Sequence, residues 1–350
     1  MRPAWLAAAF LTFVACGAPE PDDPLRPSDA GSAEGADGGP AAADLSESED
    51  PVDPGDGDAV RIDDLGGLRA SKQLRATMVD VGQGDGLVVQ LPGGKVLAVD
   101  GGPSPNDYID ALRARGIRRV DYAVLSHAHS DHYTGLTPVL TSLVPADCLG
   151  RVLDPGLERT EVTGYRDFKA AAGCRYQKVG IGQTLNLDPD VEIVVLSAHA
   201  QRFGGTDDSH GINNTSVVLR LRYRRFSLLL QGDAEQPAEQ DVATAMPTLL
   251  RSTVLKAGHH GSCTATGTTY LGLVAPQYLL MSLAADNTYG MPHCQTLSKL
   301  RARSGLRWAR TDVNGSVTVT TDGSRYVVSL GRGSDSATAC PRDCAVPLDF

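Results

Sequence analysis

The fold of this chain is decided by one short segment, Val124-Leu125-Ser126-His127-Ala128-His129-Ser130-Asp131-His132-Tyr133-Thr134-Gly135. Its four potential metal ligands are His127, His129, Asp131 and His132. The apolar residues 122–125 before them are typical of a buried strand that ends where these polar side chains begin. Imidazole and carboxylate groups are ligands that borderline divalent ions such as zinc prefer. We therefore expect His127 and His129 to bind one ion, and Asp131 and His132 to bind a second. A histidine-rich surface loop is the alternative.

Two later motifs carry further candidate ligands. Asp233 follows the apolar residues 226–230 and stands beside a glycine, so its carboxylate is placed to bridge two ions. An ordinary turn-forming aspartate after a strand is the alternative. His259 or His260, in a Gly-His-His-Gly turn, would complete the ligands of the second ion. Two exposed histidines in a glycine turn are the alternative there.

Strand and helix patterns surround these motifs in two similar halves. Alternating or continuous apolar residues predict the strands 73–81, 87–91, 95–99, 122–125, 191–196, 217–223, 226–230 and 254–256. Helical spacing predicts helices at 108–115, 135–143 and 295–304, and the polar, glycine-rich residues 198–211 predict a loop. This order fits an α/β (α+β) fold in which two mixed sheets pack face to face with helices outside, a four-layer αββα sandwich. The ligands would then lie on loops along one edge.

Residues 1–16 are typical of an export signal. Arg2 precedes an apolar run at 4–15, which is shorter than the roughly 20 residues that span a bilayer. Phe13-Val14-Ala15-Cys16 resembles a bacterial lipobox, although Phe13 replaces the usual leucine. We expect an exported bacterial protein with a lipid on Cys16 that anchors it to the outer membrane or cell surface. Plain secretion is the alternative.

Residues 17–70 have the composition of a disordered acidic tether. They are rich in proline, glycine, alanine and serine, and contain fifteen acidic residues against three arginines. Such a segment buries too little apolar surface to offset the entropy of ordering. Because the rest of the chain is close to neutral, the net charge of −10 does not argue against a polyanionic substrate. The folded domain is expected at 71–332, followed by a C-terminal tail with a cysteine pair at 333–350.

Cysteine usage also favours export. Seven cysteines leave six once Cys16 is assigned to the lipid, and an even number outside the cytoplasm suits disulfides. None of the pairs has the C-x-x-C spacing typical of zinc sites. The expected disulfides are Cys148–Cys174, Cys263–Cys294 and Cys340–Cys344.

The pattern H-x-H-x-D-H at 127–132 resembles the signature of the metallo-beta-lactamase superfamily of hydrolases. The wider set of motifs is similar, in content and order, to the hydrolase domain of the ComEC/Rec2 competence proteins. These motifs are Asp80-Val81-Gly82-Gln83-Gly84-Asp85, Asp100-Gly101-Gly102, the cluster at 127–132, Asn213 with Ser216, Gly232-Asp233-Ala234-Glu235, residues 255–262, residues 287–293 and Arg310-Thr311-Asp312. The resemblance covers about residues 72–330 and suggests a stand-alone member. No further run in the sequence is apolar enough for a transmembrane channel.

The resemblance implies a metallo-beta-lactamase sandwich with two divalent ions, zinc or else manganese. In the H-x-G variants of the superfamily the first histidine is the ligand, which favours His259 and leaves His260 to support the ligands or contact the substrate. The expected metal ligands are His127, His129, Asp131, His132, Asp233 and His259. Lactamases and glyoxalases place a histidine where this chain has Asn213 and Ser216, as the competence branch does, and only His199 and His210 could stand in. Met291 replaces a histidine usual in the family, whereas His293 is kept.

The resemblance also implies nuclease activity. The expected reaction is phosphodiester cleavage in DNA by a water that two metal ions activate. Asp131, Lys256, His260, Asn213 and Ser216 are the expected catalytic residues, of which the last four would contact phosphate oxygens or assist the leaving alkoxide. One alternative is hydrolysis of another phosphoester, such as phosphorylcholine or a lipid head group. The other is a surface protein that binds DNA through basic side chains without catalysis.

Overall fold

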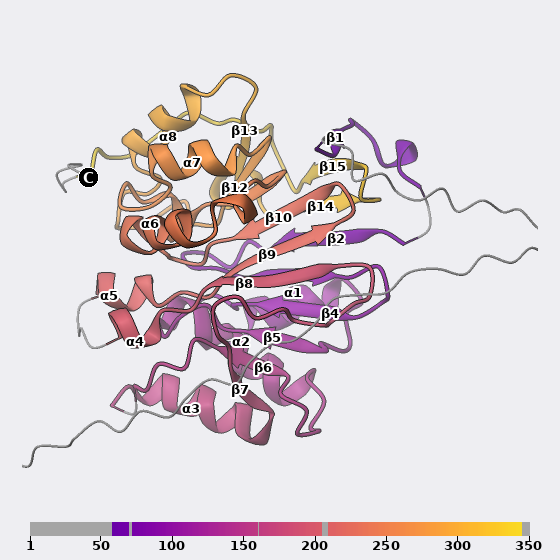
Figure 1. Cartoon of the computed structure of the whole chain (residues 1–350), viewed down its shortest axis with the longest axis vertical. Coiled ribbons are helices and arrows are strands. Elements are labelled where there is room, and N and C mark those ends of the chain that lie inside the picture. The colour runs from indigo at the N-terminus through magenta and orange to yellow at the C-terminus, as the bar shows by residue number, and fades with distance from the viewer. Residues whose placement is uncertain (1–57, 70–71, 160, 205–208, 345–350) are drawn as a thin grey trace, which may run out of the picture. The chain divides into compact units, whose positions relative to one another are not determined.

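Two β-sheets lie face to face at the centre of the fold, and helices cover their outer faces (Figure 1). The computed structural model describes residues 58–69, 72–159, 161–204 and 209–344. In order across the first sheet, the nine strands are β1 (Val60–Arg61), β15 (Arg325–Leu330), β14 (Val317–Thr321), β2 (Leu74–Met78), β3 (Leu87–Gln90), β4 (Val96–Val99), β5 (Tyr122–Val124), β6 (Val152–Asp154) and β7 (Tyr176–Lys178). The six strands of the second are β13 (Arg307–Arg310), β12 (Tyr278–Met281), β11 (Val254–Lys256), β10 (Phe226–Leu230), β9 (Val218–Tyr223) and β8 (Glu192–Ser197).

Helices follow most of these strands. The described α-helices are α1 (Asp107–Ala114), α2 (Ser130–Ser142), α3 (Thr163–Ala172), α4 (Ala200–Phe203), α5 (Ser209–Asn214), α6 (Gln236–Ala245), α7 (Thr268–Val274), α8 (Cys294–Arg301) and α9 (Thr311–Asn314). Short 3-10 helices occur at η1 (Leu65–Gly67), η2 (Gly173–Arg175), η3 (Pro247–Leu249) and η4 (Gly258–Gly261).

Three apolar cores separate the layers. The central core joins inward-facing residues of both sheets, such as Leu74 and Met78 of β2 with Leu219 of β9 and Leu228 of β10. A second core lies between the first sheet and α1, α2 and α3, and a third lies between the second sheet and α6, α7 and α8. Because strand side chains alternate between two faces, each sheet contributes to two cores. The predicted four-layer αββα sandwich is confirmed.

Polar segments leave both sheets along one edge. β4 pairs in parallel with β5, and β10 pairs in parallel with β11, so the ends of each pair lie side by side. The sheets are linked there because the backbone N–H of Val217 donates to the carbonyl of Ser126 at 2.9 Å. The segments after these four strands therefore approach one another.

Two predicted elements differ from the structure near this edge. α2 begins at Ser130, earlier than the predicted start at 135, so Asp131 and His132 lie in its first turn. The predicted loop 198–211 contains α4 and the start of α5. Short helices of this kind have too few turns to show a clear apolar period in the sequence.

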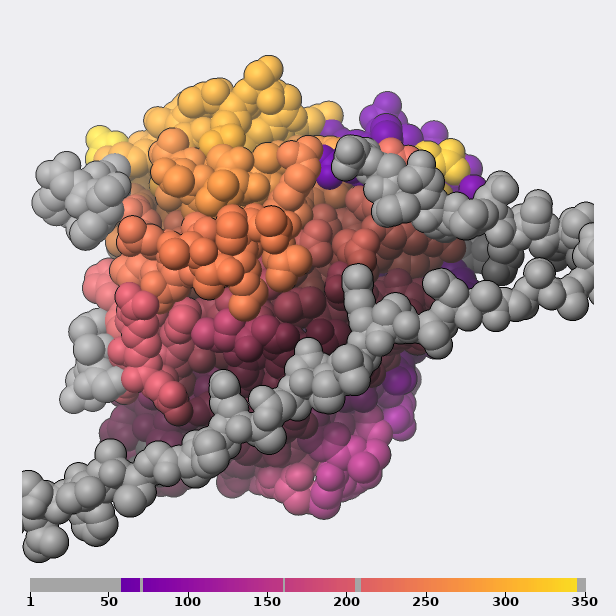
Figure 2. Space-filling model, in the orientation of Figure 1, coloured from indigo at the N-terminus to yellow at the C-terminus, as the bar shows by residue number. Residues whose placement is uncertain are grey.

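The folded part begins before residue 71. Val60 and Arg61 form β1, which pairs in parallel with β15, and Ala59 is fully buried. Figure 2 shows the indigo residues of this segment against the yellow residues of β15. The predicted tether therefore extends too far at its C-terminal end. Residues 1–57, which hold the predicted signal, Cys16 and most of the tether, lie outside the described residues. None of the described helices is long and apolar enough to cross a membrane.

Three disulfides join distant segments. The predicted pair Cys148–Cys174 is confirmed. The predicted pairs Cys263–Cys294 and Cys340–Cys344 are wrong, because Cys263 pairs with Cys344 and Cys294 pairs with Cys340.

The path of the C-terminal tail explains these pairings. The tail runs along β13, where the N–H of Ser336 donates to the carbonyl of Trp308 at 2.6 Å and the indole of Trp308 donates to the carbonyl of Ala337 at 2.9 Å. This path brings each tail cysteine to a different segment of the body.

Candidate metal centre

His132, in the first turn of α2, is held by Asp100 at the end of β4. Nδ1 of His132 lies 2.8 Å from Oδ2 of Asp100. The Asp100 carboxylate also accepts hydrogen bonds from the backbone N–H and the hydroxyl of Ser126, both at 2.7 Å. Both His132 and Asp100 are buried. When Nδ1–H donates to the carboxylate, the lone pair of Nε2 is free to bind a metal ion.

Four side chains from three segments converge at Nε2 of His132. This nitrogen lies 3.3 Å from Oδ2 of Asp233 and 3.7 Å from Oδ2 of Asp131. Nε2 of His260 lies 3.2 Å from the same Asp233 oxygen and 3.4 Å from the same Asp131 oxygen. One ligand atom from each of the four residues lies within 4.8 Å of the other three. We call these four residues the four-ligand cluster.

Several atoms of the four-ligand cluster have no hydrogen-bond partner. Nε2 of His132, Nε2 of His260 and Oδ1 of Asp233 are buried, and none of them forms a hydrogen bond with the described residues. An unpaired buried polar atom is costly, so each such atom in a native site needs an explanation. A cation bound among them would satisfy both nitrogens and the carboxylate.

The charges of the four-ligand cluster also fit a cation. Burial lowers the pKa of His132 and of His260, but nearby carboxylates, above all Asp233, raise both pKa values well above the ordinary range. Although burial opposes its ionisation, these two imidazoles hold the pKa of Asp233 well below its ordinary value. The carboxylates thus draw positive charge into the site. A divalent ion with two nitrogen and two oxygen ligands meets that demand.

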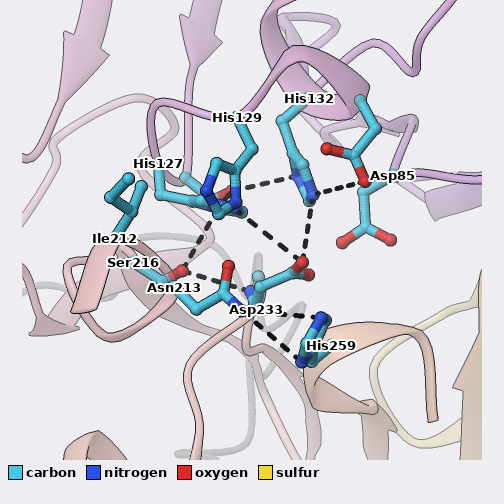
Figure 3. Close-up of polar contacts among 12 residues, drawn as sticks. Asp85, His127, His129, His132, Ile212, Asn213, Ser216, Asp233 and His259 are labelled. Carbon is cyan, nitrogen blue, oxygen red and sulfur yellow. Dashed lines mark hydrogen bonds and ion pairs between the residues drawn. The ribbon is translucent and has the colours of Figure 1, made fainter. Parts of the chain in front are cut away.

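His127 and His129 form a smaller group beside the cluster. Nε2 of His127 lies 2.9 Å from Nδ1 of His129 and 3.8 Å from Oδ2 of Asp233. Burial, with a smaller contribution from neighbouring imidazoles, holds the pKa of His127 well below its ordinary value, so this histidine is neutral and able to bind a metal ion. Figure 3 shows His127, His129 and His132 on one side of Asp233 and His259 on the other. The same Oδ2 of Asp233 also lies near His132 and His260 of the four-ligand cluster, as an oxygen of a bridging ligand would.

Ser216 stands where the resemblance to lactamases and glyoxalases would place a third histidine beside His127 and His129. Its hydroxyl oxygen accepts a hydrogen bond from the N–H of Asp233 at 3.1 Å and lies 3.4 Å from Nδ1 of His127. The two histidines that could have stood in have other partners. His199 lies 3.5 Å from Asp241, and His210 lies 2.8 Å from Glu235. Ser216 is fully buried and positions ligands.

The adjacent histidines of η4 face different groups. His260 belongs to the four-ligand cluster, whereas Nδ1 of His259 lies 2.9 Å from Oε1 of Glu235. The amide of Asn213 donates to the same Glu235 oxygen at 2.9 Å. His259 and His260 both have positive φ, 44° and 53°, which is uncommon for residues with a side chain. The sequence prediction favoured His259 as the ligand, but the structure brings His260 to the cluster.

Lys256, at the end of β11, is enclosed within the site. Its ammonium group forms an ion pair with Asp85 and donates to the carbonyl of Gly232 at 2.9 Å. It also lies 3.9 Å from Oδ1 of Asp233, and its side chain is 5% exposed. The predicted contact of Lys256 with a substrate oxygen therefore does not match its position. Asp85 is the last residue of the motif at 80–85, and nothing in a single sequence indicates that it pairs with Lys256.

His293 joins two loops near the cluster. Its Nδ1 accepts a hydrogen bond from the N–H of Cys263 at 3.0 Å, and the carbonyl of Tyr289 is a second hydrogen-bond partner of its ring. Both ring nitrogens are thus occupied. The Cys263, His293 and Cys344 group is not a metal site in this form, because its two cysteines are joined as a disulfide.

Of the six predicted metal ligands, three belong to the four-ligand cluster (Asp131, His132 and Asp233), two lie beside it (His127 and His129), and His259 faces Glu235 instead. The side of the site that is open to solvent holds the partly exposed Asp131, His129 and His259, with the Asp131 side chain 30% exposed and that of His259 19% exposed. A substrate would approach from there. Asp100, Ser126, Asp85 and Glu235 complete the site, and sequence reasoning gave none of them a role.

Comparison with known proteins agrees with this geometry. Residues 79–284 match the model of the metallo-beta-lactamase superfamily. The chain is 32% identical over 213 residues to ComE operon protein 3 of Bacillus subtilis (strain 168), covering 60% of this chain and 26% of that protein. It is 30% identical over 224 residues to competence protein ComA of Neisseria gonorrhoeae, covering 64% and 28%. The chain thus spans about a quarter of the length of these curated relatives. Among solved structures, a diphosphatase from the PhnP family aligns at 16% identity with a TM-score of 0.42, covering 71% of this chain and 99% of that chain.

Proposed function

Because the chain belongs to the metallo-beta-lactamase superfamily, we propose that it is a metal-dependent phosphodiesterase that cleaves DNA. The observation that carries the proposal is the four-ligand cluster, whose two buried imidazole nitrogens have no hydrogen-bond partner among the described residues and face two carboxylates. The similarity to a competence protein of Neisseria gonorrhoeae supports DNA as the substrate.

The donor set fits divalent cations at two neighbouring positions. Asp131, His132, Asp233 and His260 would hold one ion, and His127, His129 and Asp233 would hold the other. The first position has four protein ligands, whereas the second has three. We therefore expect the second position to bind its ion more weakly than the first. Zinc suits imidazole with carboxylate, and manganese suits the carboxylate-rich position.

Bound divalent ions supply an activated water and neutralise charge on the entering and leaving oxygens of an in-line phosphoryl displacement. The protein's own residues prepare the site for this. Asp100 fixes His132 with Nε2 toward the cluster. The Lys256 ammonium group lies between Asp85 and Asp233 and limits the excess negative charge, and Ser216 orients Asp233 and His127. We therefore assign Lys256 and Ser216 to positioning, and His260 to metal binding.

His259 and Asn213 share Glu235 at the open side of the site. His259 is partly exposed, and Asn213 is buried with its side-chain oxygen unpaired. We propose that His259 contacts the substrate phosphate, with Asn213 as a buried positioning residue behind it. The carboxylate of Glu235 orients both, because it accepts the amide of Asn213 and faces Nδ1 of His259.

The proposed location is outside the cytoplasm. Three disulfides support export, because such bonds persist in oxidising compartments. The predicted signal at 1–16 and the lipid on Cys16 remain proposals. Mass spectrometry of the protein from its own membrane fraction would detect acyl chains on Cys16, and an unmodified N-terminus there would contradict the anchor.

The activity is tested on the full chain loaded with zinc or manganese. Substrates are single-stranded DNA, double-stranded DNA, bis(p-nitrophenyl) phosphate and phosphorylcholine. We expect cleavage of DNA and of the small diester, and loss of both in Asp131→Ala and Asp233→Ala. Circular dichroism of these variants checks that they remain folded.

Other outcomes select the alternatives. Turnover of phosphorylcholine or the small diester without DNA cleavage would favour another phosphoesterase. DNA binding without turnover of any substrate would favour a surface DNA-binding protein. Cleavage that survives both alanine substitutions would contradict the assignment of the cluster.

A further inference from the structure

The loop at 284–293, which we call the rim loop, borders the metal centre. The side-chain oxygen of Gln83 accepts a hydrogen bond from the N–H of Ala284 at 3.3 Å. Gln83 stands two residues before Asp85 in the sequence. At the other end, the N–H of His293 donates to the carbonyl of Gly261 at 3.1 Å, next to His260. The rim loop therefore lies between the two segments that carry Asp85 and His260.

The rim loop is held in one conformation by its own polar groups. Asn287 accepts a hydrogen bond from the N–H of Met291 at 2.9 Å and donates to the carbonyls of Ala284 and Met291, both at 2.8 Å. His293 links the loop to the segment after His260 through Cys263. A side chain at the tip of such a loop is presented with little loss of entropy on binding.

That tip exposes an aromatic side chain. Tyr289 is 60% exposed, and it is one of six large hydrophobic residues that the described chain leaves exposed. A single exposed hydrophobic residue is ordinary on a protein surface. Tyr289 differs because its loop is fixed and adjoins the predicted site, and because a cation lies against the next residue, Gly290.

The cation is Arg342 of the C-terminal tail. Its side chain runs along Gly290, since a Cβ built on that glycine would lie 2.7 Å from Cβ and 3.3 Å from Nε of Arg342. Gly290 has φ +75°, so glycine meets both the backbone requirement and the close approach. The disulfides at Cys340 and Cys344 fix the tail on both sides of Arg342. Among the described residues its guanidinium forms no ion pair. Burial lowers the pKa of His293 most, and the positive charges of His259 and then of Arg342 lower it further.

We propose that Tyr289 and Arg342 form a contact site for single-stranded DNA at the rim of the metal centre. This inference rests on the proposed function. An unpaired base would stack on the Tyr289 ring, and the adjoining phosphate would meet the Arg342 guanidinium. A duplex offers no free base face to the ring, because its bases are already stacked on one another. The pair of residues thus selects single strands, and the disulfide-fastened tail supplies the cation.

The test measures binding of a fluorescein-labelled 15-nucleotide single strand and of the matching duplex by fluorescence anisotropy. The full chain is kept in excess chelator so that no cleavage occurs. We expect Tyr289→Ala to weaken single-strand binding about 5- to 100-fold, and Tyr289→Phe to retain it. Arg342→Gln should weaken binding and reduce the slope of log affinity against log salt by about 0.7. Ile181→Ala, at another exposed hydrophobic residue that is 43% exposed, is the matched control and should bind as the parent does.

The proposal is overturned if Tyr289→Ala and Arg342→Gln bind the single strand within 2-fold of the parent chain, or if the parent prefers the duplex. Hydrolysis of bis(p-nitrophenyl) phosphate by the metal-loaded variants keeps this result separate from the proposed function. The small diester carries neither a nucleobase nor an adjoining phosphate, so both variants should cleave it at the parent rate. Failure of the parent to cleave it would count against the phosphodiesterase, whereas the anisotropy result decides the contact site alone.

Discussion

Asp100→Asn tests how the metal centre is built without removing a proposed ligand. Asparagine has nearly the same shape and tolerates the φ of 55° found at Asp100, so the backbone is not strained. In the native chain, the carboxylate accepts three donors, which are the N–H and hydroxyl of Ser126 and Nδ1 of His132. An asparagine side chain has only one acceptor oxygen. The NH2 side of the asparagine amide must then face a group, on Ser126 or His132, that donates a hydrogen bond to the carboxylate in the native chain.

The magnitude follows from which contact is lost. If the amide nitrogen faces His132, the proton of that ring moves to Nε2, the atom that points into the four-ligand cluster, and metal binding must remove it. Loss of such a supporting carboxylate lowers metal affinity about 10- to 100-fold, which is about 1.4 to 2.7 kcal/mol. If the amide instead faces Ser126, a buried N–H is left unpaired, which costs about 1 to 3 kcal/mol of folding stability. One of the two readouts must therefore change.

The assay is competition for zinc and manganese with a chromogenic chelator at pH 7.5, together with urea unfolding of the metal-free chain. Asp110→Asn is the matched control, because Asp110 is exposed on α1 and its one ion pair within the described part of the chain is with Arg113 at 3.5 Å. We expect the control to match the parent in both measurements. A variant at Asp100 that binds metal within 2-fold of the parent and unfolds at the same urea concentration would refute the reasoning.

Three further predictions follow from other parts of the fold. His260→Ala should weaken metal binding more than about 100-fold, whereas His259→Ala, which leaves the four-ligand cluster intact, should weaken it less than about 10-fold. The metal that stays bound after dialysis distinguishes the two variants. Equal losses would contradict the separate roles of the two histidines. Burial raises the pKa of Glu239 to about 7, although the N–H groups of Thr266 and Gly267 donate hydrogen bonds to its carboxylate. Its contribution to the free energy of unfolding is therefore full below about pH 4.5, where the carboxyl of the unfolded chain is also protonated, and is lost as the pH rises to 7. The parent should therefore lose about 3 kcal/mol of unfolding free energy over that range through this residue, and Glu239→Gln should show a flatter urea-denaturation profile, so an unchanged pH dependence would argue against it. Replacing Cys148 and Cys174 together by serine releases a loop with a sequence separation of 26 and should cost about 3 kcal/mol, measured as a lower urea midpoint, whereas no change would show that this bond does not constrain the unfolded chain.

The layers of the fold were predictable because their signals are local. Alternation in residues 217–223, followed by the mostly apolar residues 226–230, specifies a hairpin, and β9 and β10 pair antiparallel there, with Tyr223 opposite Phe226. The start of α2 was not predictable in the same way. Ser130, Asp131 and His132 are polar and hide the first helical turn, although an acidic residue there suits a helix N-terminus.

The members of the site were predictable by residue type, but their partners were not. The spacing of His127, His129, Asp131 and His132 marks a metal-binding segment by itself. The choice between His259 and His260 depends instead on two consecutive residues with positive φ, which a sequence of two histidines does not reveal. The predicted pairing of the tail cysteines was wrong for a related reason. Their pairing depends on a path along β13 that is fixed by hydrogen bonds of the Ser336 N–H and hydroxyl with the backbone of Trp308, and this path carries no sequence signal.

The charge of the site links these separate features. Asp85, Asp100, Asp131 and Asp233 bring four carboxyl groups together, and Lys256 is the one lysine or arginine that the structure pairs with them among the described residues. Buried carboxylates remain ionised only where positive charge compensates them. Without metal, that compensation falls to His132 and His260, whose pKa values are raised, after the opposing effect of burial, chiefly by Asp233. A metal ion at Nε2 of either ring must displace the proton that compensates the carboxylates. Protons and a bound metal ion would therefore compete for the same nitrogens, and protonation of the two rings would let this buried acidic site fold before a metal ion binds.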